Sequence, residues 1–383
     1  MVGADAHRLP FGLTSGYLQS IHYLTCGTAV EFEAALLQLL ERLRPDVFLP
    51  LGTAATAVAS RNLERLRRLT AINVPTLDAF QMAYDKARCA QECHASGVPH
   101  PQTLSLAQAR SLLAAAPAGT RVVVKPAFDV GAAVGVLYPR DPASLESAWL
   151  ACRSRYGEVL VQEYIPGGPE SMKTAILLLA PSGRLSAWFT TQKTRVWPPS
   201  GGSTATSTSS AEFVLIEQVL PLFEKWQWRG PAEVEFKLDP RDGRHKVIEI
   251  NPRFPGYLRF PCRCGLNLAT LAVEAALGSE VKATASPMYK VGAAYVNPGF
   301  WLRAGVAELS ANPRPWLRFL REIGKAAREF FDLVQDPQAA AAVSINEGLC
   351  LLGRNERCSP SEWCWLPDRS SQSSRTAGQE GGC

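Results

Sequence analysis

The sequence reads Ala-Glu-Val-Glu-Phe-Lys at residues 232–237 and Val-Ile-Glu-Ile-Asn-Pro-Arg at residues 247–253, with a polar turn that contains Asp-Pro-Arg-Asp-Gly between them. The alternation of apolar and polar residues predicts an antiparallel hairpin that places Glu235, Glu249 and Asn251 on one face. Carboxylate and amide oxygens are the ligands that Mg²⁺ prefers, and nucleotide phosphates usually complete its shell. The hairpin is therefore interpreted as a platform for a metal-bound nucleotide.

Outward-facing acids on a half-buried strand are also common without any metal, so the hairpin alone leaves an ordinary structural interpretation open. Pro252 lacks a backbone N–H and should end the second strand, which would bring Arg253 out beside the acids. The metal interpretation therefore depends on partner residues elsewhere in the chain.

The length and composition are those of a globular protein. With 383 residues, the chain is long enough for roughly two or three compact units. The formal net charge of +5 is small for this length and the basic residues are dispersed, which argues against nucleic acid as a partner. No apolar stretch approaches membrane-spanning length and the N-terminus lacks a signal-peptide pattern, so we expect a cytoplasmic protein without membrane association.

The first part of the chain alternates strand-like and helical patterns. Residues 2–5 resemble the end of a short strand, and residues 31–44 carry apolar side chains at helical spacing. Residues 46–50 and 71–75 read as further strands. This βαβ alternation predicts a small Rossmann-like parallel-sheet domain over residues 1–77. Its first βα unit is expected to be missing, because the chain starts inside a strand.

The rest of the chain mixes helices with strands. Strands are expected at residues 122–126, 159–165, 173–179 and 185–191 and in the hairpin, and helices at residues 86–96, 142–155, 211–226 and 268–277. The segment at about residues 103–158 is expected to act as a hinged lid. Residues 281–345 are expected to be an extension with an amphipathic helix at about 315–331, and residues 346–383 a disordered tail.

Two lysines are candidates for binding an anion. Lys125 ends an expected strand just before a turn that contains Gly131 and Gly135, so its ammonium group and the following backbone N–H groups could meet the same phosphates. Lys86 opens a helix and could approach from another side. A lone lysine is more commonly a solvated charge, and the glycine turn is also compatible with a simple hairpin loop.

The segment Gln-Glu-Tyr-Ile-Pro-Gly-Gly at residues 162–168 is a candidate purine site. The backbone groups of such a strand edge can bind a purine while apolar side chains enclose the ring. Its ordinary interpretation is a strand that ends at Pro-Gly-Gly.

Taken in order, these segments resemble the ATP-grasp superfamily, in particular the ADP-forming carboxylate–amine ligases and the carbamoyl-phosphate-synthase-like ATP-grasp proteins. The resemblance covers about residues 2–280, and Glu-Ile-Asn-Pro-Arg at residues 249–253 is its most specific element. It implies an α/β and α+β chain with the ATP-grasp fold. The small, N-terminally shortened Rossmann-like domain would be followed by an ATP-grasp domain over residues 78–280, with a lid subdomain and a C-terminal lobe.

The resemblance also implies a site for ATP and Mg²⁺, with Mn²⁺ as an alternative cation. The residues implied at the nucleotide are Lys86 and Lys125 with the turn of Gly131 and Gly135 at the phosphates, Glu163, Tyr164 and Ile165 at the adenine, and Glu170 at the ribose. The implied metal ligands are Glu235, Glu249 and Asn251. The implied catalytic residues are Arg253, whose guanidinium group matches carboxylate and phosphate geometry, and Lys193 and Arg195.

The activity implied is that of an ATP-dependent ligase, which activates a carboxylate as an acyl phosphate and transfers it to an amine, releasing ADP and phosphate. Such chemistry needs positioning and charge neutralisation rather than a protein nucleophile. Two alternatives stay open: a catalytically inactive ATP-binding regulatory or scaffold protein of the same descent, and an ATP-grasp carboxylase or carbamoyl-transfer enzyme. The expected partners are a small-molecule carboxylate and an amine, with no nucleic acid and no membrane, and a homodimer is one arrangement the chain could adopt.

Overall fold

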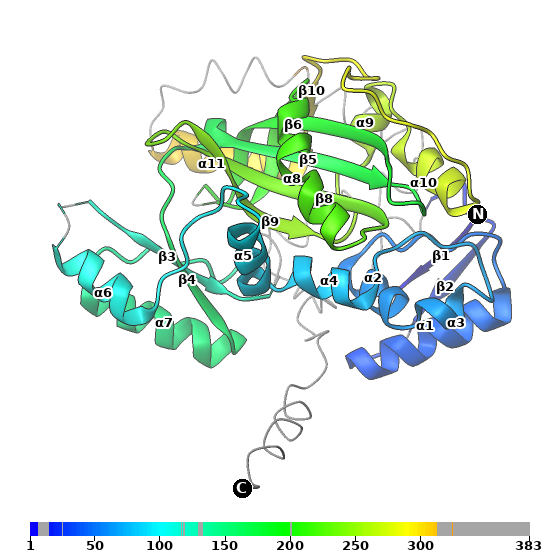
Figure 1. The fold of residues 1–383 in the computed structure, drawn as a ribbon, viewed down its shortest axis with the longest axis horizontal. Helices are drawn as coiled ribbons and strands as arrows, with labels where there is room; N and C mark the ends of the chain where they lie inside the picture. The colour runs from blue at the N-terminus through cyan, green and yellow to red at the C-terminus, as the bar shows by residue number, and fades with distance from the viewer. Residues whose placement is uncertain are drawn as a thin grey trace, which may run out of the picture.

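The computed structural model describes residues 1–6, 15–24, 26–115, 117, 119–128, 133–199, 201–311 and 324. Its largest sheet has six strands in the order β10-β7-β6-β5-β8-β9, and each neighbouring pair is antiparallel. The strands are β5 (Met172–Leu179), β6 (Leu185–Trp197), β7 (Ser203–Ser210), β8 (Gly230–Asp239), β9 (Arg244–Asn251) and β10 (Ala294–Val296). Helix α8 (Phe213–Lys225) lies across this sheet (Figure 1).

The main hydrophobic core lies on this large sheet. Strand β5 is buried from Thr174 to its end because its residues are almost all apolar, as expected for a central strand. Apolar side chains of α8 and of α10 (Leu268–Ala276) pack against β5, β6 and β8. The sheet is therefore the rigid base from which the β8–β9 hairpin presents its side chains.

The lid forms a separate small unit with its own core, on the left of the view in Figure 1. Its strands β3 (Val122–Pro126) and β4 (Val159–Glu163) are antiparallel, and helices α6 (Leu106–Ala115) and α7 (Pro142–Tyr156) pack against them. The predicted strands and the predicted α7 match these elements closely. The segment that was predicted to be a lid therefore shares one small core with β4, and its movement as a lid stays a prediction.

The N-terminal unit is less regular than a Rossmann-like sheet. Its elements are β1 (Val2–Asp5), β2 (Ser20–Tyr23), α1 (Ala29–Leu43), α2 (Thr53–Arg61), α3 (Leu63–Leu66) and α4 (Leu77–Tyr84). Strands β1 and β2 are parallel, but the strands expected at residues 46–50 and 71–75 are reduced to one parallel bridge between Val47 and Ala71. Each of these segments ends in a proline, which cannot donate to a sheet and limits the pairing.

Asn73 of the N-terminal unit makes two close contacts with the large sheet. The side-chain amide of Asn73 donates to the carbonyl oxygen of Leu179 at 2.9 Å and is buried. A Cβ atom at Gly230 would lie 2.3 Å from the carbonyl oxygen of Asn73, and Gly230 has a φ of +78°. Only glycine fits this junction without strain.

Four further helical elements complete the described fold. They are α5 (Lys86–Ala95), the 3₁₀ helix η2 (Pro169–Ser171), α9 (Arg259–Arg263) and α11 (Pro298–Ala311). Strand β7 and helix α11 were not predicted from the sequence, whereas the helix predicted near residues 315–331 and the predicted tail lie outside the described residues, apart from residue 324. Among the described residues, no helix has both the length and the apolar character needed to cross a bilayer.

The central position of β5 leads to a stability prediction. Ile176→Ala should lower the free energy of unfolding by about 2–5 kcal/mol, because it leaves a cavity at a side chain with no exposed surface. Val214→Ala on α8, where the side chain is 61% exposed, should have little effect. Urea unfolding followed by tryptophan fluorescence reports on this core, which contains Trp188, Trp226 and Trp228. Similar losses in the two variants would contradict the assignment of the core.

Candidate active site

A cleft with a volume of about 350 Å³ lies between the lid and the β8–β9 hairpin. Its lining includes the predicted residues Lys86, Lys125, Glu163, Tyr164, Ile165, Glu235, Glu249, Asn251 and Arg253. Gly135, Glu170, Lys193 and Arg195 do not line it, and Gly131 lies outside the described residues. The fold thus brings most of the predicted residues, distant in sequence, to one cavity.

The hairpin presents its acids as the alternation predicted. In the β8–β9 register, Glu235 lies opposite Glu249 and Glu233 lies opposite Asn251, so all four belong to one face. The amide nitrogen of Asn251 donates to both Glu233 and Glu249 at 3.3 Å, so its amide oxygen would be the atom to contact a metal. Glu233 was missed in the sequence analysis, although it lies two residues before Glu235 in the same alternating strand.

Lysines approach these acids from three elements. Lys193 Nζ on β6 lies 2.8 Å from Glu235 Oε1, and Lys86 Nζ lies 3.5 Å from Glu249 Oε2. Lys86 is the first residue of α5, and the side chain of Asp85 caps this helix by accepting from the backbone N–H groups of Ala87 and Arg88. Lys125 at the end of β3 donates to the carbonyl oxygen of Ile248 at 3.5 Å. The lid and α5 therefore both supply a cation to the hairpin.

Burial and neighbouring charge give these groups unusual acidities. Burial lowers the pKa of Lys125 to about 8, and the nearby charge of Lys86 adds to this effect. Burial alone would raise the pKa of Glu249, but Lys86 and Lys125 outweigh it and lower the pKa to about 2. Burial raises the pKa of Glu233 to about 7 against the attraction of Arg253, and it also raises the pKa of Glu235. Glu249 is therefore held in its charged form by the lysines, whereas burial favours the protonated forms of Glu233 and Glu235.

The donor set fits a magnesium ion that also contacts a nucleotide. In the described ranges, no group of three or more His, Cys, Asp or Glu side chains is arranged to hold a metal by itself. Glu235, Glu249 and the amide oxygen of Asn251 instead form a partial set. Mg²⁺ typically uses such a set of one or two carboxylates, with phosphates and waters as the other ligands.

Arg253 connects the hairpin to the N-terminal unit. Its Nε donates to the hydroxyl of Thr53, the first residue of α2, at 3.0 Å, and its Nη1 donates to Glu233 at 3.4 Å. Pro252 ends the strand as expected, because β9 stops at Asn251. The guanidinium group is therefore fixed from two sides at the edge of the cleft.

Lys193 and Arg195 occupy different places from those expected. Strand β6 continues to Trp197 instead of ending near Thr191, so both residues lie inside the strand. Arg195 is 2% exposed and makes a two-pronged ion pair with Glu308 of α11, at 2.8 Å for each contact. The structure does not bring Arg195 into the cleft, and Lys193 reaches it only through its contact with Glu235.

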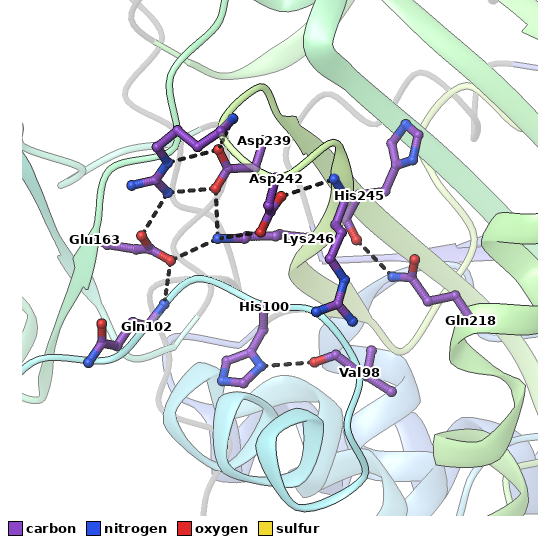
Figure 2. Close-up of polar contacts among 11 residues, drawn as sticks. Val98, His100, Gln102, Glu163, Gln218, Asp239, Asp242, His245 and Lys246 are labelled. Carbon is purple, nitrogen blue, oxygen red and sulfur yellow. Dashed lines mark hydrogen bonds and ion pairs between the residues drawn. The ribbon is translucent and has the colours of Figure 1, made fainter.

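The carboxylate of Glu163 is held in an ion-pair cluster at the hairpin turn (Figure 2). It accepts from Lys246 at 3.1 Å, from Arg241 at 2.7 Å and from the backbone N–H of Gln102 at 3.0 Å. Lys246 and Arg241 also bind the buried Asp239, at 2.6 Å and 2.5 Å. The cluster ties the end of β4 to the β8–β9 turn, a role that the sequence did not indicate.

Aromatic and cationic groups surround Tyr164 beside this cluster. The Arg121 guanidinium carbon and Lys237 Nζ lie 4.5 Å and 5.1 Å from the centre of its ring, and Tyr138 meets it edge-on at 5.8 Å. Lys237 and Tyr138 line the cleft and were not identified from the sequence. Tyr164 therefore gives the cleft an aromatic surface beside Lys237 of β8.

The two remaining predicted residues have local structural roles. The carboxylate of Glu170 accepts from the backbone N–H of Gly168 at 2.9 Å. Gly135 has a φ of +78°, and a Cβ there would lie 2.6 Å from the ring of Tyr156. Its neighbours Val134 and Val136 line the cleft, so Gly135 shapes the turn without lining the cleft itself.

Comparisons with known proteins agree on the fold. Residues 156–297 match a family model described as "ATP-grasp in the biosynthetic pathway with Ter operon". A search of curated proteins finds no match. The resemblance to the ATP-grasp superfamily that was predicted from the sequence is confirmed, and so is the predicted fold class.

Solved structures of low sequence identity share this fold. The biotin carboxylase domain dimer of Hydrogenobacter thermophilus 2-oxoglutarate carboxylase, solved with MgADP and bicarbonate, is 14% identical with a TM-score of 0.58, covering 76% of this chain and 67% of that one. The L-amino acid ligase of Bacillus licheniformis is 15% identical with a TM-score of 0.52, covering 73% and 74%. D-alanine–D-alanine ligase of Bacillus anthracis is 15% identical with a TM-score of 0.51, covering 72% and 97%.

The ion-pair cluster predicts a pH-dependent contribution to stability. Hydrogen bonds from Arg241 and Lys246 hold the pKa of Asp239 below its ordinary value, so the stabilisation is present above about pH 4 and is lost as the pH falls. Asp239→Asn should lower the free energy of unfolding by about 1–3 kcal/mol at neutral pH, because it removes the charge of a buried carboxylate that binds both Arg241 and Lys246. The difference from the parent protein should shrink in acid.

The matched control is Asp242→Asn in the same turn, whose side chain is 40% exposed and lies 3.6 Å from Lys246. Urea unfolding at neutral and acid pH should show a small effect for this variant. A loss for Asp239→Asn that stays constant down to low pH would contradict the role assigned to its charge.

Proposed function

From the ATP-grasp fold of this chain, we propose that it is an ATP-dependent ligase that activates a carboxylate as an acyl phosphate and transfers the acyl group to an amine. The observation that carries the proposal is the convergence of Glu235, Glu249 and Asn251 with Lys86 and Lys125 in one cleft. Phosphoryl transfer requires charge neutralisation and positioning, and these residue types supply both.

The hairpin is the proposed metal and phosphate site. Glu235, Glu249 and Asn251 would hold Mg²⁺, or Mn²⁺ in its place, and the bound cation would neutralise charge on the phosphates of ATP. Lys125 is buried and has a lowered pKa, so an anion beside it would stabilise its charged form. Lys86 would contact the phosphates from the N-terminus of α5, where the helix dipole also favours negative charge.

The proposed site for the base of the nucleotide is the segment that follows β4. Tyr164 and Ile165 follow β4 and line the cavity, and their backbone groups would bind the adenine. The Glu163 carboxylate, which was expected at the adenine, would act through the ion-pair cluster by fixing this segment against the hairpin. Glu170 would contact the ribose of the same nucleotide.

Arg253 is the proposed anchor of the acid substrate. It would hold the carboxylate for attack by one of its oxygens on the γ-phosphorus of ATP, which forms the acyl phosphate and releases ADP. Attack by the amine on the acyl carbon then forms the amide and releases phosphate. The lid, which carries Lys125, would exclude water from the acyl phosphate when it closes.

Hydroxylamine trapping tests this function without knowledge of the natural amine. A panel of carboxylic acids is incubated with ATP, Mg²⁺ and hydroxylamine, and hydroxamate and ADP are measured. Glu249→Gln should lower kcat by about 10²–10³-fold, because it removes a charge that would hold the cation. The control Glu274→Gln replaces an exposed glutamate of α10 and should retain the parent rate.

Two results would count against the proposal. ATP binding without acid-dependent ADP formation across the panel would indicate a non-catalytic nucleotide-binding protein. Turnover that requires bicarbonate in place of an organic acid, with no hydroxamate, would indicate carboxylation or carbamoyl transfer.

A further inference from the structure

One wall of the cleft is aromatic and comes from the last part of the described chain. We define the aromatic wall as Tyr257, Tyr295 and Phe300, all of which line the cleft and are partly exposed to it. Tyr257 follows the hairpin, Tyr295 lies on β10, and Phe300 lies in the first turn of α11. None of the three was identified from the sequence as a site residue.

The aromatic wall rests on the core of the large sheet. The rings of Tyr257 and Tyr295 lie 5.6 Å apart, and the ring of Tyr295 lies 5.3 Å from that of the buried Phe260. Phe260 in turn meets Phe189 of β6 edge-on at 5.3 Å. Such ring pairs hold one another in defined orientations, so the wall is a preformed surface.

Helix α11 fixes the position of Phe300. The Asn297 side chain accepts from the backbone N–H of Phe300 at 3.0 Å and caps the helix, while the Asn297 N–H donates to the carbonyl oxygen of Ala205 on β7 at 2.8 Å. Farther along the helix, Glu308 binds the buried Arg195 of β6. This explains why Arg195 is buried away from the cleft: it anchors the helix that carries Phe300.

The aromatic wall begins next to the proposed carboxylate anchor. Arg253 is followed by Pro255 and Gly256, which also line the cleft, and then by Tyr257. Arg253 contacts Glu233, and the charge of Glu233 is close enough to Tyr257 to contribute, after burial, to a raised pKa of its phenol. A ligand held at Arg253 would therefore have the wall within reach of its other groups.

We propose that the acid substrate carries an aromatic or similarly bulky apolar group that packs on the aromatic wall, and that Phe300 determines this specificity. The inference rests on the proposed ligase function. Burying an apolar group against such a surface is favourable in proportion to the area removed from water, whereas a small acid would leave the wall hydrated. Arg253 supplies recognition of the carboxylate, and the wall supplies discrimination among carboxylates.

The test uses matched pairs of acids in the hydroxylamine assay: acetate with 3-phenylpropanoate, and glycine with phenylalanine. Within at least one pair, the aromatic acid should have a kcat/KM at least about ten-fold higher than the small acid. Phe300→Ala should lower this ratio by about ten-fold, and Phe300→Leu, which retains apolar volume, should lower it less. Tyr23→Ala, which replaces a 59% exposed tyrosine of β2, should leave the ratio unchanged.

The outcomes separate this inference from the function on which it rests. Hydroxamate formation that favours the small acids, or does not distinguish within either pair, would overturn the inference while supporting the ligase function. An unchanged ratio in folded Phe300→Ala and Phe300→Leu would likewise overturn it. If no acid in the wider panel yields hydroxamate, the ligase function itself fails, and the inference fails with it.

Discussion

The crowding of three carboxylates on the β8–β9 hairpin sets the electrostatics of the whole cleft. Antiparallel pairing of β8 with β9 places Glu233, Glu235 and Glu249 side by side with Asn251, and β5 pairs with the other edge of β8. Such a group of acids requires positive charge, and the structure supplies it from several sides. Lysines arrive from the lid, from α5 and from β6, and Arg253 arrives from the segment after the hairpin.

This constraint explains why distant units of the chain meet at the cleft. The lid contributes Lys125 at the end of β3, and the N-terminal unit contributes the Thr53 hydroxyl that binds Arg253. The ion-pair cluster around Asp239 and Glu163 ties β4 to the turn of the same hairpin. The proposed phosphate, base and acid subsites are thus all positioned relative to β8 and β9.

Local patterns in the sequence predicted the hairpin, β3, β4, α7 and α5, because each has a clear alternation or a capping residue such as Asp85, whereas α6 was not predicted. Strand β7 was missed because Ser-Thr-Ala-Thr-Ser-Thr-Ser-Ser has no apolar alternation, and β6 and β10 pair with it through the backbone. Arg195 was expected in the cleft from the family resemblance. Its ion-pair partner Glu308 lies 113 residues away in the sequence, so no local pattern could indicate that Arg195 is buried beside α11. The aromatic wall likewise depends on packing that no local pattern records.

The most direct measurement is a crystal structure of the protein with Mg²⁺ and a non-hydrolysable ATP analogue. We expect the cation at about 2.0–2.1 Å from oxygens of Glu235 and Glu249, with phosphates beside Lys86 and Lys125 and the base beside Tyr164. A nucleotide bound elsewhere, or bound in this cleft with no cation at Glu235 and Glu249, would contradict it.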